Sequence, residues 1–382
     1  MQLSIIILNY NVRYFLELCV LSVQNATQNI DAEIIVIDNN SQDDSCVMMK
    51  KRFPNVKLIE NKENLGFPKG NNIGVAAAQG EYICILNPDT VVAEDTFTKV
   101  MAFAKKQKDL GIVGVKLIDG TGNFLPESKR GIPTPFVAFT KITGLYKIFP
   151  KTFGKYYAQH LSENKTGKVE ILVGAFMLLK RDLYNEINGF DENCFMYSDD
   201  FDLSYMALKK GKSNYYFHET SVIHYKGEST IKDETYMKRF QEAMNFFYKK
   251  HFEVSFLFSV FMKMGIVFFS LVKMFQGKPK LKPSPEFFIL VSEDEVLRGK
   301  LENQLGKLVK RQNITKSFAE NANIEIIFDQ NHLDFKTIIK TFETNNNKGF
   351  TFKIIPESSD YMIGSNSSFD RGEVIKILDF RF

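Results

Sequence analysis

Cysteine is scarce in this sequence of 382 residues, and its four cysteines are far apart (Cys19, Cys46, Cys84 and Cys194). No two of them form a CxxC pair, so the pattern excludes a disulfide framework and gives no sign of a zinc site. Cys84 lies inside an apolar run and is expected to be a small core residue. We therefore expect a protein of the reducing cytoplasm.

Two further features are missing. The first apolar run, Ser4 to Leu8, already has the pattern of a buried strand, which leaves no room for a secretory signal. The formal net charge is only +4, and no basic run interleaved with aromatic residues precedes residue 249, so we expect no nucleic-acid partner. The remaining composition, 44% hydrophobic and 25% charged, is ordinary for a globular protein with a buried core.

Short apolar runs alternate with segments of helical length over the first 120 residues. The runs are rich in Ile and Val, are bounded by Asn, Asp, Gly or Pro, and cover residues 3–8, 33–38, 56–60, 82–86 and 112–117. Fully apolar strands that alternate with helices predict an α/β fold with a mainly parallel sheet and helices on both faces. In such sheets ligands bind beyond the carboxyl ends of the strands.

The pattern changes after about residue 120. A loop rich in Pro and Gly at 130–135 is followed by an expected strand around 169–180, a helix after Ser198, two short strands near 214–224 and a helix over 233–250. We expect residues 1–250 to form one domain. Residues 251–285 should form an amphipathic apolar helix and a linker. Residues 286–382 should form a small α/β domain of unknown role, with strands near 287–291, 324–328 and 350–355.

Polar residues follow the first two strands. Asn9 comes after the first, where neither a GxGxxG fingerprint nor a glycine-rich basic loop is present, which argues against a dehydrogenase and against a nucleotidyltransferase. Asp38 comes after the second, where its carboxylate could accept from a nucleotide base or a ribose hydroxyl. The neighbouring Ser41 has a simpler interpretation as the cap of the following helix.

Two further candidate sites follow the third and fourth strands. A Gly/Asn-rich turn over 64–74 contains Asn64, Gly66, Asn71 and Asn72, which could bind a nucleotide or serve only the backbone. Asp89, in the stretch Asn-Pro-Asp, suits Mg²⁺ or Mn²⁺ opposite a diphosphate, because these ions prefer oxygen ligands and keep phosphate oxygens in their shell. The alternative interpretation of this stretch is a turn in which Asp89 caps the next helix.

The densest polar cluster holds three carboxylates in four residues: Asp199, Asp200 and Asp202. Acidic residues favour the first turn of a helix, which explains one or two of them better than all three. A general base that deprotonates an acceptor hydroxyl needs a carboxylate fixed on such a rigid element. His224 follows at the end of an expected strand, and a lone histidine is more often structural than a metal ligand.

Together these stretches resemble family 2 glycosyltransferases, in particular the bacterial rhamnosyltransferase-like members that build cell-surface polysaccharide. Seven pieces appear in the order of the family over residues 3 to 250: ILNYN, VIDNNSQD, NLGFPKGNNIG, LNPDT, GAFMLLKR, NGFDENCFMYSDDFDLSY and HYKGEST. The resemblance implies the GT-A fold, with a Rossmann-like nucleotide-binding half fused to an acceptor-binding half. It also implies an inverting enzyme that moves a sugar, rhamnose in the nearest members, from a nucleotide diphosphate to an acceptor hydroxyl.

The resemblance implies roles for single residues. Asp38 would read the base or ribose, with Asn9 near the nucleotide, and Asp89 would stand in the metal-binding motif. Asp200 would be the catalytic base, supported by Asp199 and Asp202. His224 would help to hold the Mg²⁺ or Mn²⁺ ion, which reverses the simpler interpretation of this histidine.

Two positions depart from the family pattern. The usual DxD motif has become Asn87-Pro88-Asp89, with one acid instead of two, so metal binding would be weaker or would depend on His224. Met206 stands where many relatives carry Arg, so an ion pair made there is absent. Neither change removes the expected base.

The longest apolar run covers residues 254–275. Its polar residues fall on one narrow stripe of a helical wheel and lysines flank it, which suits either a helix lying at a membrane surface or a helix buried against protein. A spanning helix is disfavoured by Lys263 near its middle. A peripheral position on the inner face of the cytoplasmic membrane would bring the enzyme to a lipid-linked acceptor.

The principal alternative function is a binding module, in which a GT-A scaffold recognises a nucleotide sugar without turnover. The three acids and His224 favour an active enzyme, since a scaffold has no need of all four. Its partners would then be a nucleotide diphosphate sugar donor and a glycan or lipid-linked acceptor.

Overall fold

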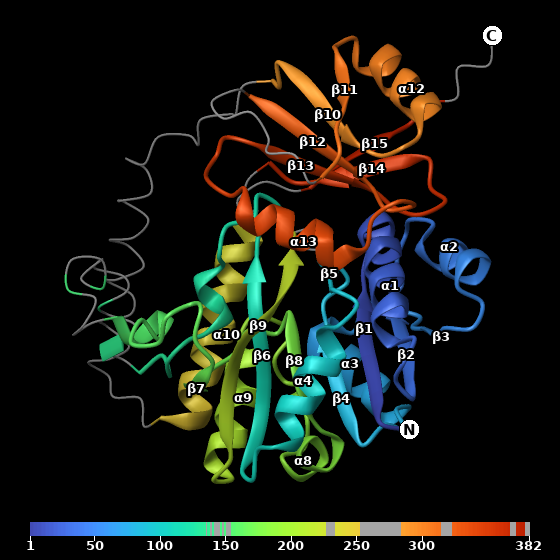
Figure 1. Cartoon of the computed structure of the whole chain (residues 1–382). Helices are drawn as coiled ribbons and strands as arrows, with labels where there is room; N and C mark the ends of the chain where they lie inside the picture. Colours follow the sequence, from blue (N-terminus) through green and yellow to red (C-terminus); the bar gives the residue numbers. More distant parts are fainter. Residues whose placement is uncertain are drawn as a thin grey trace.

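The computed structural model describes residues 1–134, 154–226, 234–252, 284–314, 323–366 and 372–378, together with a few single positions between 136 and 149. Two β-sheets make up its framework, one from the N-terminal part of the chain and one from the C-terminal part (Figure 1). The seven-residue strand β1 at the centre of the first sheet is buried along its whole length.

The first sheet has the strand order β3-β2-β1-β4-β8-β6-β9-β5, with β7 paired to β9. Its strands are β1 (Leu3–Asn9), β2 (Ala32–Asp38), β3 (Lys57–Glu60), β4 (Tyr82–Leu86), β5 (Thr90–Val91), β6 (Leu110–Ile118), β7 (Gly167–Val169), β8 (Phe176–Lys180) and β9 (Ser213–His224). Strands β3, β2, β1, β4, β6 and β9 run in one direction, while β8, β5 and β7 oppose them. The expected mixed, mainly parallel sheet is therefore confirmed.

Helices cover both faces of this sheet. They are α1 (Arg13–Thr27), α2 (Ser45–Arg52), α3 (Gly66–Ala76), α4 (Thr96–Lys105), α8 (Arg181–Glu186), α9 (Asp199–Lys209) and α10 (Glu234–His251), with 3-10 turns η1 (Pro126–Ser128) and η2 (Gly154–Tyr157). Alternate side chains of β1 point to opposite faces, so Ile5 and Ile7 pack with α1, α2 and α4, whereas Ile6 and Leu8 pack with α3, α8 and α9. This arrangement confirms the expected helices on both faces.

The C-terminal part forms a second, mixed sheet in the order β11-β10-β12-β13-β14-β15. Its elements are β10 (Phe287–Val291), α12 (Glu295–Leu305), β11 (Val309–Arg311), β12 (Ile324–Asp329), α13 (Phe335–Thr344), β13 (Thr351–Ile355), β14 (Tyr361–Gly364) and β15 (Glu373–Lys376). Each helix begins after an aspartate, Asp294 or Asp334, whose side chain accepts from backbone amides of the first turn. The expected small α/β appendage is confirmed.

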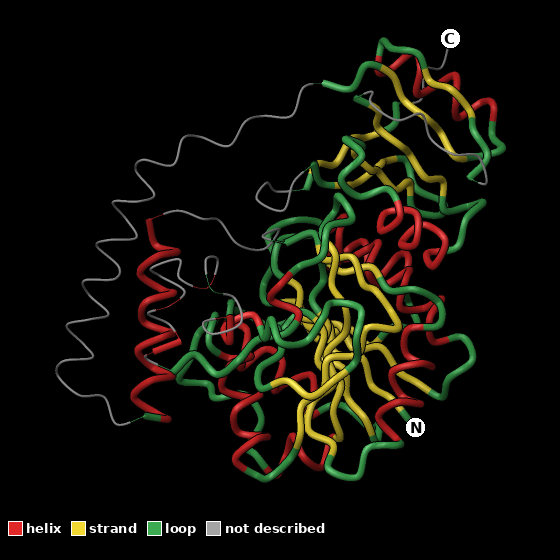
Figure 2. The backbone as a smooth tube through the Cα atoms, turned by 60° about the vertical axis from the view of Figure 1, so that its left-hand side comes forward, coloured by secondary structure: helices red, strands yellow, loops and turns green. Residues whose placement is uncertain are grey.

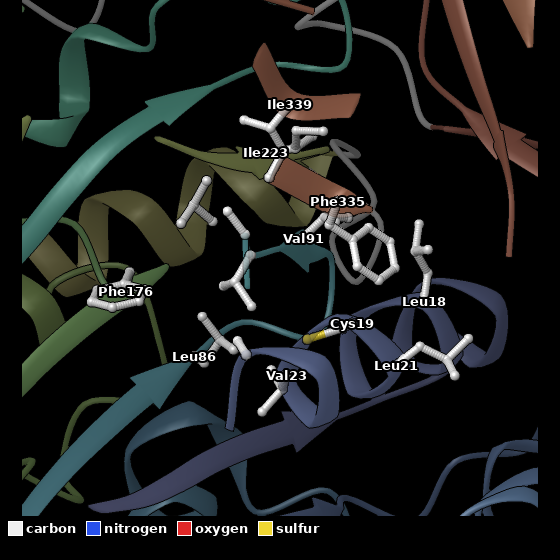
Figure 3. Close-up of a cluster of buried hydrophobic side chains, with 14 of the residues drawn as sticks. Leu18, Cys19, Leu21, Val23, Leu86, Val91, Phe176, Ile223, Phe335 and Ile339 are labelled. Atoms are coloured by element: carbon white, nitrogen blue, oxygen red, sulfur yellow. The ribbon is translucent and has the colours of Figure 1, made fainter. Parts of the chain in front are cut away.

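Helix α13 lies between the two sheets (Figures 1 and 2). Its residues Phe335 and Ile339 lie beside Val91, Ile223 and Leu18 in one cluster of buried side chains (Figure 3). The hydrophobic core of the first sheet is therefore continuous with that of the second. The division of the chain near residues 250 and 286 into separate domains stays a prediction.

The stretch over 64–74, expected to be a turn, differs most from its prediction, because it forms helix α3 from Gly66. The reason is close packing. A Cβ atom on Gly74 would lie 2.5 Å from both Ile37 and Ile6, so the glycine lets the helix approach the sheet closely. Glycines that look like turn residues in the sequence therefore serve helix–sheet contact.

Three smaller expectations were also wrong. The segment 169–180 is two strands, β7 and β8, joined by a loop, and the two short strands near 214–224 are one strand, β9, with irregular register against β6. Ser41 does not cap a helix, because α2 begins only at Ser45. The hydroxyl of Ser41 instead accepts from the side-chain amide of Asn9, 3.0 Å away, and from the backbone of Asn11.

The apolar segment 254–275, with its expected membrane contact, lies outside the described residues. Among the helices that are described, none is both long enough and apolar enough to cross a membrane.

Candidate active site

Asn9 and Asp38 lie side by side where β1 and β2 end, since the register pairs these two residues. The side-chain amide of Asn9 donates to Asp38 Oδ1 at 2.7 Å, and the backbone amide of Ser41 donates to Asp38 Oδ2 at 2.8 Å. Asn9 and Asp38 are both buried, and Asn9 Oδ1 makes no hydrogen bond within the described part of the chain. The sheet edge therefore holds a fixed carboxylate next to a free amide acceptor.

The four residues predicted around α3 divide into two groups. Asn64 accepts from the backbone amide of Gly66, whose φ is +80°, and Asn71 is fully buried with its Oδ1 unpaired among the described residues. Asn72 differs, because its amide donates to Phe190 O at 2.9 Å and its oxygen accepts from Tyr184. The side chain of Asn72 is thus used to hold the segment before α9, and its role in donor binding stays a prediction.

Asp89 and His224 meet beyond the ends of β4 and β9. Asp89 Oδ1 lies 3.3 Å from His224 Nε2, yet Asp89 Oδ1 has no aligned hydrogen bond to any described residue. Both side chains are buried, and the amide of Asn87 lies 3.4 Å from the same ring nitrogen. Two adjacent ligands of an octahedral Mg²⁺ or Mn²⁺ ion are about 3 Å apart, so this oxygen and nitrogen have the spacing of a shared ion.

Asp199 and Asp200 open α9, and both are buried. Asp200 Oδ2 accepts from the guanidinium of Arg130 and, at 3.1 Å, from the backbone amide of Gly174. Asp200 Oδ1 is buried and has no hydrogen-bond partner among the residues described. Burial and the adjacent charge of Asp200 raise the pKa of Asp199 to about 7. The two neighbouring acids therefore have different environments.

Asp202 faces helix α10. Its carboxylate lies 2.9 Å from Lys250 Nζ and 2.5 Å from His251 Nε2, and Lys250 also reaches Asp191 at 2.6 Å. This carboxylate ties the start of α9 to the end of α10. Its position gives Asp202 a structural contact, and its predicted support for catalysis stays a prediction.

Glu127 connects the two halves of the site electrostatically. Burial alone would raise its pKa, but the nearby Lys226 and, more weakly, His224 lower it. Glu127 also contributes to the raised pKa of Arg130, in which the larger influences are burial, which lowers it, and Asp200, which raises it. Glu127 is therefore within electrostatic range of both His224 and Arg130.

Sequence reasoning missed Arg130, Glu127 and Lys226. Arg130 opens a loop that was noted only for its Pro and Gly, and Glu127 lies in η1 just before it. A buried arginine has no periodic signature, so the available signal was only its place next to the Pro-Gly loop. Asn39 was also missed; its buried side chain donates to Gly66 O and joins the end of β2 to the start of α3.

With this geometry in view, the chain was compared with known proteins. The model of glycosyl transferase family 2 matches residues 4–187. These residues belong to glycosyl transferase family 2. The matched range contains Asn9, Asp38, Asp89 and Arg130, whereas the α9 acids and His224 follow it in the chain.

Two relatives extend the likeness beyond these residues. It is 26% identical over 243 residues to the N-acetylglucosaminyl-diphospho-decaprenol L-rhamnosyltransferase of Mycobacterium tuberculosis, covering 60% of this chain and 78% of the relative. It is 23% identical over 215 residues to the low-salt glycan biosynthesis hexosyltransferase Agl10 of Haloferax volcanii, covering 55% of this chain and 62% of that relative. The expected resemblance to rhamnosyltransferase-like members of family 2 is therefore confirmed.

Among solved structures, this chain is similar to GalNAc-T7 crystallised with UDP, GalNAc and Mn²⁺, with 18% sequence identity and a TM-score of 0.48. The match covers 64% of this chain and 48% of that one, so it spans about half of GalNAc-T7.

Proposed function

We propose that this chain is an inverting, metal-dependent glycosyltransferase that moves a sugar from a nucleotide diphosphate to an acceptor hydroxyl. The observation that carries the proposal is a pair of buried carboxylate oxygens, Asp89 Oδ1 and Asp200 Oδ1, that no described residue hydrogen-bonds. Buried polar atoms are seldom left unpaired unless something else uses them. The two are linked through the backbone, which supports one shared cleft: the amide of Gly174 donates to Asp200, and the next residue, Ala175, accepts from Asn87 beside His224.

The nucleotide would bind at the ends of β1 and β2. Asp38 is held in place by Asn9 and Ser41, so a base or ribose would meet a carboxylate of fixed orientation. Asn9 Oδ1 and Asn71 Oδ1 add buried acceptors that lack partners within the described ranges. These atoms would accept from N–H or O–H groups of the nucleotide.

Asp89 and His224 would hold the metal ion. Their donor atoms are 3.3 Å apart, and a carboxylate with an imidazole is a set that Mn²⁺ or Mg²⁺ accepts when phosphate oxygens complete its shell. When bound, the ion would neutralise charge on the departing diphosphate. A site with only two side-chain ligands would bind the metal weakly without the donor.

Asp200 would act as the general base. The proton of the acceptor hydroxyl passes to Asp200 Oδ1, and the hydroxyl oxygen forms a bond to the anomeric carbon. The bond from that carbon to the diphosphate breaks on the opposite side, and its electron pair leaves with the nucleoside diphosphate. Displacement in line inverts the configuration at the anomeric carbon.

The transferred sugar would be rhamnose and the acceptor a lipid-linked glycan. Both proposals are supported by the likeness to the mycobacterial rhamnosyltransferase, whose name specifies an N-acetylglucosaminyl-diphospho-decaprenol. Such an acceptor belongs to cell-surface polysaccharide synthesis. We place the reaction in the cytoplasm, at the inner face of the cytoplasmic membrane, with residues 254–275 as the proposed contact.

The test is release of nucleoside diphosphate from UDP-, TDP- and GDP-sugars with Mn²⁺ and a polyprenyl-diphosphate glycan acceptor. Asp200→Asn should lower kcat at least 100-fold and leave the donor Kd within about twofold, because a positioned general base contributes about 10²- to 10⁴-fold. Asp182→Asn, an exposed aspartate in the first turn of α8, is the control and should retain activity. Near wild-type turnover by Asp200→Asn would contradict the assignment. Donor binding without turnover by the wild type would favour the non-catalytic scaffold.

A further inference from the structure

Arg130 is a buried cation that lies shortly after η1, where its backbone forms a β-bridge with Ile171. Its backbone pairs with Ile171 through two hydrogen bonds of 2.9 Å, and only 7% of the residue is exposed. Its guanidinium donates to Leu172 O at 3.0 Å and stacks over the ring of Phe201 at 4.0 Å from its centre. These contacts hold the side chain in one place.

The remaining hydrogen bond of Arg130 goes to Asp200 Oδ2. The backbone amide of Gly174 donates to the same oxygen, so both partners hold one side of the carboxylate. The other oxygen, Oδ1, is buried and unpaired within the described residues. A carboxylate fixed through one oxygen presents the second in a defined direction.

No hydrogen bond is recorded between Arg130 and the neighbouring Asp199 in the described structure. Its pKa is raised to about 7 by burial and by the charge of Asp200. Two adjacent carboxylates in different environments take different roles.

We propose that Arg130 is the positioning residue of the base: its guanidinium fixes Asp200 through Oδ2 and aims Oδ1 at the acceptor hydroxyl. The proposal rests on the proposed glycosyl transfer and deepens it. Arg130 touches neither sugar nor nucleotide in this role and acts only through Asp200. Misplacement of a reacting group by about 1 Å is enough to cost about 100-fold in rate.

A cavity of about 340 Å³ lies against Arg130. Its other lining residues include Gly131, Leu208 and Asn214, which belong to the loop after η1, the end of α9 and the start of β9. We expect a small cation to reach the place of the guanidinium through this space when the arginine side chain is removed. Chemical rescue is therefore a direct test.

In the test, Arg130→Ala is assayed with the nucleotide sugar and acceptor that the wild type uses. We expect kcat to fall about 100-fold while the donor KM stays within about twofold, because only the orientation of the base is lost. Ethylguanidinium at tens of millimolar should restore kcat at least tenfold in Arg130→Ala, and ethylammonium should not. The planar group donates to Leu172 O and Asp200 Oδ2 while it stacks on Phe201, and a point charge cannot make all of these contacts.

Two controls separate positioning from folding. Arg181 is a partly buried arginine whose guanidinium donates to Gly80 O and Ala78 O and forms no ion pair with a carboxylate in the described part of the chain. Arg181→Ala should keep its kcat and show no rescue. Arg130→Lys keeps the charge and part of the stem, and it should fold and show an intermediate kcat if Arg130→Ala does not fold.

The outcomes are distinct. Wild-type kcat in Arg130→Ala or Arg130→Lys, or loss of kcat and donor binding together without rescue, would overturn the positioning role and leave the glycosyl transfer intact. If ethylguanidinium also restores Asp200→Asn, the rescue does not act through Asp200 and the role is refuted. No nucleoside diphosphate release by the wild type would instead refute the proposed function.

Discussion

Asp199 offers a prediction about stability that can be worked out from its environment. Its pKa is about 7 in the folded protein against an ordinary value of 3.8, because burial and Asp200 disfavour the charged form. The folded state therefore holds this proton more tightly than the unfolded state. The resulting stability is fully present below about pH 4 and is lost as the pH rises through 7.

The magnitude follows from the two pKa values. One pKa unit corresponds to about 1.4 kcal/mol, so the whole effect is about 4 kcal/mol, of which about 3 kcal/mol falls between pH 5 and pH 8. An asparagine cannot titrate. The free energy of unfolding of Asp199→Asn, measured relative to wild type, should thus shift in favour of the variant by about 3 kcal/mol as the pH rises from 5 to 8.

The assay is urea unfolding followed by circular dichroism at pH 5, 6, 7 and 8 for wild type and Asp199→Asn. The titrating groups other than Asp199 are common to both proteins, so the contributions of those distant from Asp199 largely cancel in the difference, and what is measured is the effect of Asp199 together with its neighbour Asp200. Asp182→Asn, exposed on α8, should show a difference that does not change with pH. A difference between Asp199→Asn and wild type that is flat within about 0.5 kcal/mol would refute this account of the site.

Two further predictions concern the packing. Glu17 is a buried carboxylate of α1 that pairs with Arg13 and Arg52, so Glu17→Gln should lower the free energy of unfolding by about 3 kcal/mol. The control Glu60→Gln breaks an exposed pair and should lower it by less than about 1 kcal/mol. A loss for Glu17→Gln no larger than that of the control would contradict the argument. A Cβ on Gly122, at φ +82°, would lie 2.1 Å from the carbonyl oxygen of Phe342 on α13. Gly122→Ala should therefore lower Tm through both strain and this clash, and Gly211→Ala, at φ +74° with open space around it, should lower it less; equal losses of Tm would show that the contact with α13 contributes nothing.

Most of the strands could be predicted, because their signal is local. The strand β4 was predicted at its observed bounds, and β1, β2 and β6 within two residues at either end, since each is an apolar run bounded by residues that end strands. Helix α3 could not be predicted, because its glycines owe their place to contact with Ile6 and Ile37. That contact exists only once the sheet has formed.

The candidate site, like the fold, could be predicted only in part. The sequence indicated which polar residues follow the strands, and the parallel register then places Asn9 beside Asp38. It did not indicate that Arg130 pairs with Asp200, because these residues are 70 positions apart and neither carries a periodic signal.

The sequence by itself determined the order of the elements, the apolar cores of the strands and the residues that stand at the strand ends, because these follow from side-chain periodicity along short segments. Only the tertiary structure decided that Asp200 meets Arg130 while Asp202 meets Lys250, and that α13 of the C-terminal part shares a core with the first sheet. Such pairings depend on how distant segments pack in three dimensions, and no local pattern encodes them.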